Sequence, residues 1–136
     1  MRLLALAFAA ATFPASAQEL GERTQRPEAM VPALAPGQDD LAEAIAAAQA
    51  HPLGSRDNPV RVGGPDGERA YLARLRCADG SAPQVGERMD AGVGAFGTII
   101  AAYPARCGDA KARIAFDMYH EEHVEARAPA GFTLTR

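Results

Sequence analysis

The clearest periodic pattern of apolar positions lies between residues 39 and 50. Apolar side chains recur there at the three- and four-residue spacing of one helical face, at Leu41, Ala44, Ile45 and Ala48. Asp40 can cap this segment, with Glu43 three residues later. His51 precedes Pro52, and a residue before proline avoids the helical conformation. The pattern predicts one helix from Asp40 to about Ala50.

After this helix the spacing changes to alternation. Apolar and polar side chains alternate through 71–77, 98–103 and 113–120, and shorter runs of the same kind occupy 59–62 and 132–135. Segments rich in Gly, Pro and Asp separate them, including 63–67, and predict turns. The chain is therefore expected to be α+β, with one N-terminal helix packed on a small, mostly antiparallel sheet of about four or five strands.

The first 17 residues have the pattern of a secretory signal peptide. Arg2 precedes an apolar run, Pro14 breaks it, and Ala15-Ser16-Ala17 has the small residues of a cleavage site. The run is about half the length that a transmembrane helix needs, so no membrane span is expected. We predict a signal peptide over 1–17, a Pro- and Ala-rich linker or arm over 18–38 that could also pack on the domain, and a single domain over 39–136.

Composition narrows the classes of function. With 136 residues, 48% of them hydrophobic and 6% aromatic, the chain has room for one domain rather than a multidomain enzyme. Its formal charge of −3 lacks the basic footprint of a nucleic-acid binder. Export leads to the periplasm or the extracellular space, where thiols oxidise. Cys77 and Cys107 are the only cysteines, so we predict that they form one disulfide between neighbouring strand ends.

Gly92-Val93-Gly94-Ala95-Phe96-Gly97 matches the glycine spacing of a dinucleotide-binding loop. Such a loop follows an apolar strand and opens a helix, whereas here the preceding residues are polar and Thr98-Ile99-Ile100 is strand-like. We interpret the segment as a bulged lead into a strand and expect no cofactor.

The densest group of possible metal ligands is His120-Glu121-Glu122-His123. In a strand, His120 and Glu122 would share one face, whereas in a helical turn His120 and His123 would meet. A zinc site needs three or four ligands, and His51 is the only other histidine. A solvated strand end or turn and a divalent-metal site formed by His120, His123 and Glu122 are the alternatives here.

A hydrolase would need a nucleophile beside a base. Ser55 and Ser81 are the only serines after residue 17, and both lie in turn-like sequence. A small hydrolase with His120 or His51 as its base is a further alternative. Arg69, Arg74 and Arg76 are a candidate basic patch, with a solvated sheet face as the simpler interpretation.

The sequence thus favours a small exported, non-catalytic binding or interaction module stabilised by one disulfide. Its expected partner is an envelope or extracellular protein or a small ligand, without nucleic acid. The aromatic residues Tyr71, Tyr103, Phe116 and Phe132 are expected in the core. The alternatives are a metal-binding protein centred on His120 and His123, and a small hydrolase.

Overall fold

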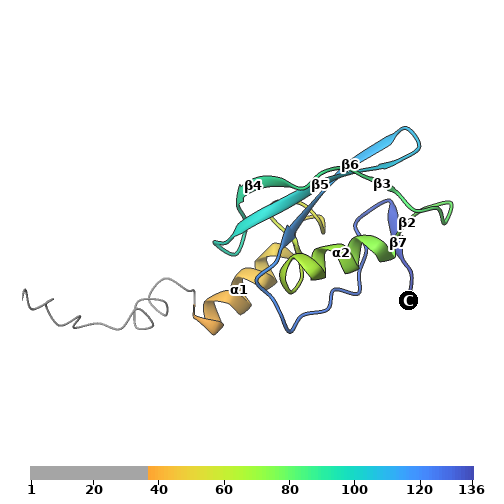
Figure 1. The fold of residues 1–136 in the computed structure, drawn as a ribbon. Helices are drawn as coiled ribbons and strands as arrows, with labels where there is room; N and C mark the ends of the chain where they lie inside the picture. The colour runs from red at the N-terminus through yellow and green to blue at the C-terminus, as the bar shows by residue number, and fades with distance from the viewer. Residues whose placement is uncertain (1–36) are drawn as a thin grey trace, which may run out of the picture.

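The computed structural model describes residues 37–136, which form an α+β fold with two helices and a mostly antiparallel sheet (Figure 1). The elements in chain order are α1 (Gln38–Ala48), β1 (Val60–Arg61), α2 (Gly64–Arg74), β2 (Leu75–Cys77), β3 (Gln84–Val85), β4 (Met89–Val93), β5 (Ile99–Cys107), β6 (Ala110–Asp117) and β7 (Phe132–Leu134). The fold class and the sheet agree with the sequence-based prediction, which missed α2. The predicted signal peptide and residues 18–36 of the predicted arm lie outside the described residues.

The first helix has the predicted face and shifted ends. Ala48 is buried, and Leu41, Ala44 and Ile45 are half-buried. The helix begins at Gln38, the last residue assigned to the arm, so Asp40 is its third residue and not its cap. The Asp40 carboxylate accepts a hydrogen bond from the Gly37 N–H at 3.3 Å, which still satisfies one free donor of the helix start.

The second helix corrects two predictions, the turn at 63–67 and most of the strand at 71–77. Pro65 in its first turn and Arg74 in its last turn are ordinary helix signals. Glu68, Tyr71 and Leu75 follow helical spacing and are buried, whereas Ala73, which completed the alternating pattern, is exposed. The chain becomes extended only at Leu75–Cys77.

The main sheet has the strand order β1-β6-β5-β3, and β4 also pairs with β5. Along one edge β5 pairs with β6, and along the other it pairs with β4 near its start and with β3 near its end. Only the β1–β6 pair is parallel. Strands β2 and β7 form a separate antiparallel pair. Neither helix within residues 37–136 is long and apolar enough to cross a membrane.

The core lies between α2 and one face of the main sheet. Tyr71 from α2 and Tyr103 from β5 both meet the Phe116 ring edge-on, with ring centroids 5.5 Å apart in each pair. Phe116 and Tyr71 are buried, and Tyr103 and Phe132 are half-buried against the same cluster. The four aromatic residues expected in the core therefore belong to it.

The glycine-rich segment leads into β5 with a bulge, as predicted, but it also closes a hairpin with β4, a strand that the sequence did not predict. The register of β4 on β5 shifts between Asp90 and Val93. Gly92 and Gly97 have φ angles of +75° and +77°, which side chains rarely adopt. No helix follows these glycines, so the segment lacks the helix N-terminus on which a dinucleotide-binding loop depends.

The disulfide joins Cys77 to Cys107, as predicted, with the two Cα atoms 5.7 Å apart. The bond joins two strand ends, as expected, but these strands are not neighbours in one sheet. Cys77 ends β2 and Cys107 ends β5, and these strands belong to different sheets. The bond therefore connects the small β2–β7 sheet to the main sheet.

Candidate functional site

Three carboxylates are buried among residues 37–136. The residues Glu68 and Asp117 have no exposed surface, and Glu125 is 4% exposed. A buried carboxylate is unfavourable unless charged or polar partners surround it. The partners of the three therefore define the candidate sites.

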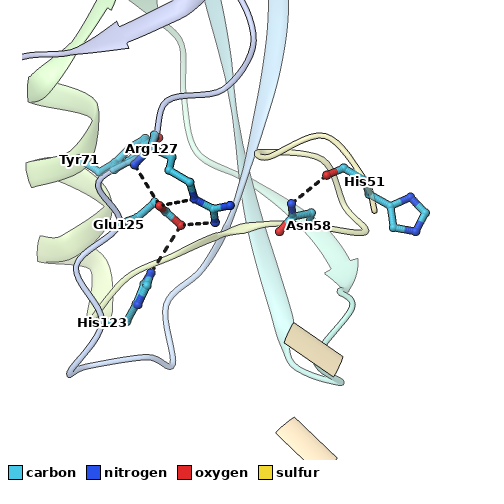
Figure 2. Close-up of polar contacts among 6 residues, drawn as sticks. All are labelled: His51, Asn58, Tyr71, His123, Glu125 and Arg127. Atoms are coloured by element: carbon cyan, nitrogen blue, oxygen red, sulfur yellow. Dashed lines mark hydrogen bonds and ion pairs between the residues drawn. The ribbon is translucent and has the colours of Figure 1, made fainter. Parts of the chain in front are cut away.

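Glu125 lies at the centre of a polar cluster that also contains Arg127, Tyr71 and His123, here called the Glu125 cluster (Figure 2). Arg127 donates to both carboxylate oxygens, from Nε to Oε1 and from Nη2 to Oε2, each at 3.0 Å. Its backbone N–H adds a third bond to Oε1 at 3.0 Å. His123 Nε2 lies 3.5 Å from Oε2, and the Tyr71 hydroxyl donates to the Arg127 carbonyl at 2.7 Å. The cluster holds a short loop against α2.

This environment keeps Glu125 ionised. Burial alone raises its pKa, but the hydrogen bonds and positive charge of Arg127, with the contact to His123, outweigh burial and lower the pKa to about 2. Burial also raises the pKa of Tyr71, and the negative charge of Glu125 adds to that increase. At neutral pH the cluster therefore contains a carboxylate, a guanidinium and an uncharged phenol.

A groove of about 220 Å³ lies beside the cluster, between α2 and residues 121–125, and is here called the α2 groove. Gly67 and Ala70 give it a wall of small residues, and Val124, 77% exposed, lies in its lining. Arg74 and Glu121 supply opposite charges to its lining. The groove combines apolar walls with polar groups that are already positioned, the usual make-up of a ligand site.

The two histidines of the candidate metal site lie in a turn, since the His123 N–H donates to the His120 carbonyl at 3.0 Å. Strand β6 has already ended at Asp117, so of the two conformations weighed for this segment the turn is the one present. Each ring is beside its own carboxylate: His120 Nε2 is 3.5 Å from Asp117 Oδ1, and His123 Nε2 is 3.5 Å from Glu125 Oε2.

The His120 side chain is mostly buried, whereas a solvated strand end or turn was one of the two expectations. Its side chain is 9% exposed and meets the Phe96 ring edge-on, with centroids 5.3 Å apart. Its Nε2 is buried without a hydrogen-bond partner, since 3.5 Å to Asp117 is longer than an ordinary bond. Glu122 is exposed. Within residues 37–136, no three His, Cys, Asp or Glu side chains are grouped so that they could hold a metal ion.

The Asp117 carboxylate forms its hydrogen bonds with groups other than His120. Its carboxylate accepts hydrogen bonds from the Thr98 hydroxyl and, at 3.1 Å, from the Tyr119 N–H. Burial raises the pKa of Asp117, but His120, Thr98 and the Tyr119 N–H together lower it below the usual value. The carboxylate thus ties the end of β6 to the start of β5.

Glu68 forms the third polar cluster, between α2 and the main sheet. Arg88 donates to it from Nε at 2.9 Å and from Nη2 at 3.3 Å, and the Tyr103 hydroxyl donates at 2.7 Å. The Arg88 side chain is 45% exposed, so the pair runs from the surface into the core. This arrangement anchors the helix to the sheet.

The residues proposed for a hydrolase have local structural contacts. Ser55 Oγ accepts a hydrogen bond from the Asn58 N–H at 3.1 Å, and Ser81 Oγ donates to Asp79 at 2.6 Å. The His51 carbonyl accepts a bond from the Asn58 side chain at 2.9 Å, and Figure 2 shows the His51 ring directed away from the Glu125 cluster. The structure places neither serine with a histidine.

The candidate basic patch is not one sheet face, because Arg74 ends α2 whereas Arg76 lies in β2. Arg69 pairs with Asp66. Arg74 Nε donates to the Thr135 carbonyl at 3.1 Å, and Arg76 donates to the carbonyls of Ala73 and Leu75. The guanidinium groups of Arg74 and Arg76 therefore bind backbone carbonyls near the end of α2, in β2 and after β7.

Glu68 and the partnership of Glu125 with Arg127 were not predicted. Glu68 lies three residues before Tyr71 and seven before Leu75, so a glutamate on the apolar side of a helix was the available signal. Arg127 follows Glu125 in a loop where no periodicity applies.

Comparison with protein-family models, with curated proteins and with solved structures finds no match to this chain.

Proposed function

We propose that this protein is a small exported, disulfide-stabilised binding module without catalytic activity, and that its ligand occupies the α2 groove. The observation that carries the proposal is the groove itself, whose small-residue wall on α2 faces a loop already positioned by the Glu125 cluster. A site whose side chains are held before binding loses less entropy when the ligand arrives.

The chemistry around the groove supports binding over catalysis. The Glu125 charge is neutralised by Arg127, and the Tyr71 hydroxyl is used in a bond to a backbone carbonyl. The hydroxyl groups of Ser55 and Ser81 form hydrogen bonds within their own turns. These groups stabilise the walls of the groove, and its expected occupant is a small ligand or a side chain of an envelope or extracellular protein.

Export is the other half of the proposal. Its support is the sequence of residues 1–17, together with a disulfide of the kind that persists in oxidising compartments. The protein would then meet its partner outside the cytoplasm, in the periplasm or the extracellular space.

A photo-crosslinking residue placed at Val124 tests the groove in cells that export the protein. We expect one reproducible adduct, lost when Ala70→Leu fills the groove and retained with the control Ala73→Leu. Both alanines are exposed on α2, but only Ala70 lines the groove, and leucine is a good helix former. Absence of any adduct, or an adduct that survives Ala70→Leu, would contradict the proposal.

A further inference from the structure

Three positive charges share one face at the far end of the β5–β6 hairpin. Arg106 lies directly opposite Lys111, and Arg113 lies opposite Pro104 in the same register. Since residues two apart in a strand point to the same side, Arg106, Lys111 and Arg113 form one surface, here called the basic face. All three are exposed, and the turn of the hairpin stands clear of both helices (Figure 1).

The described structure does not neutralise these charges. Across residues 37–136, the arginines that form ion pairs with acids are Arg69, Arg88 and Arg127, and none belongs to the basic face. Like charges directly opposite each other in an antiparallel pair are destabilising. The Arg106–Lys111 pair therefore has an unfavourable interaction that a bound anion would remove.

A hollow of about 290 Å³ adjoins the basic face, between β3 and the hairpin. Arg106 and Lys111 line it, together with the Gln84 amide and Pro104. Gln84 lies opposite Arg106 in the β3–β5 register, so its side chain is on the same side of the sheet. These three lining residues carry an amide, a guanidinium and an ammonium, which together offer several donors to one acceptor group.

We propose that this hollow is a binding site for phosphate groups, separate from the α2 groove. Phosphate offers several acceptor oxygens, and arginine and lysine are the side chains that recognise it in proteins. The hollow is larger than a single phosphate, which leaves room for a small organic group esterified to it. A phosphorylated small molecule or a phospholipid headgroup carries this chemistry.

NMR titration of the mature protein with inorganic phosphate and with glycerol phosphate tests the site, with ionic strength held constant because salt screens exposed charges. We expect saturable amide shifts at Gln84, Gly86, Arg106 and Lys111. In Arg106→Gln/Lys111→Gln the affinity should fall by about tenfold or more. The control Arg69→Gln/Arg136→Gln removes the same charge from exposed positions elsewhere and should change the affinity less than about twofold.

Vesicles of phosphatidylglycerol, compared with phosphatidylcholine, distinguish the two sources of the group. Vesicle binding that needs Arg106 and Lys111 identifies a headgroup, and saturation by the soluble phosphates alone identifies a small ligand. Melting temperatures measured without ligand show whether the variants fold. The melting temperature of Arg106→Gln/Lys111→Gln should equal or exceed that of the wild type, because the variant removes the repulsion between Arg106 and Lys111. No response to any probe, or equal responses in the two double variants, would overturn the proposal.

Discussion

Glu68, Asp117 and Glu125 show how a small fold accommodates buried charge. Each carboxylate accepts hydrogen bonds from at least two groups, and for Asp117 and Glu125 these partners lower the pKa in spite of burial. Removing one partner leaves a buried charge uncompensated, which destabilises a fold more than the intact pair stabilises it. The stability of the protein should therefore be sensitive to these few positions and to pH.

The lowered pKa of Glu125 determines how the free energy of unfolding should change with pH. Its pKa in the folded protein is about 2, below the ordinary value of 4.5, so between these values the unfolded state binds more protons. Its contribution, on the order of 3 kcal/mol, is fully present above about pH 4.5 and is lost as the pH falls toward 2. Glu125→Gln should lower the free energy of unfolding at pH 7 and flatten its decline in acid.

Urea unfolding at pH 7, 4.5 and 3 measures both effects. The exposed Glu122→Gln serves as control and should follow the wild type at each pH. If the stability of Glu125→Gln declines in acid as steeply as that of the wild type, Arg127 does not stabilise the ionised form of Glu125.

At the scale of elements, α2 connects the core to the α2 groove. Tyr71 on its inner side and Leu75 directly after its last residue belong to the core cluster. Glu68 fastens the helix to the sheet through Arg88 and Tyr103. The segment at residues 119–125 packs closely on the start of α2, where a Cβ atom on Gly63 would lie 2.9 Å from the Glu121 Cα. The position of α2 therefore sets the width of the groove.

Arg88→Gln tests this anchor. It leaves Glu68 buried with Tyr103 as its hydrogen-bonding partner and should destabilise the fold by on the order of 2–3 kcal/mol in urea unfolding. The exposed Arg113→Gln, which removes the same charge, should cost less than about 0.5 kcal/mol. Adding Glu68→Gln to Arg88→Gln should restore part of the loss, because the uncompensated charge is removed. A double variant no more stable than Arg88→Gln alone would argue against the ion pair as the anchor.

At the scale of the whole molecule, the disulfide unites the two sheets. Cys77 and Cys107 are 30 residues apart, and a loop of this length corresponds to about 3–4 kcal/mol of stabilisation in the chain-entropy model. The C-terminal strand β7 pairs with β2 alone, so the bond also holds the end of the chain on the domain.

We expect Cys77→Ser/Cys107→Ser to lower the free energy of unfolding by about this amount, with the earliest hydrogen exchange in Phe132–Leu134. The intact mass of the full chain expressed with its N-terminal segment and recovered from the envelope should be that of a chain beginning at Gln18, two hydrogen atoms lighter than its reduced form. Retained residues 1–17 would contradict export, and two free thiols in native material would contradict the disulfide.

The sequence by itself determined the α+β class, the face of α1, the glycine-rich bulge before β5 and the disulfide, because periodicity, glycine-rich turns and two lone cysteines are local or countable features. It misassigned α2, because Tyr71 to Cys77 fits alternation as well as helical spacing until Glu68 is known to be buried. Only the tertiary structure decided that each histidine faces a different carboxylate, that Arg127 neutralises Glu125, and that Arg106 stands opposite Lys111. Those relations depend on strand register and on chain segments meeting in space, and the spacing of residues along the chain carries no record of either.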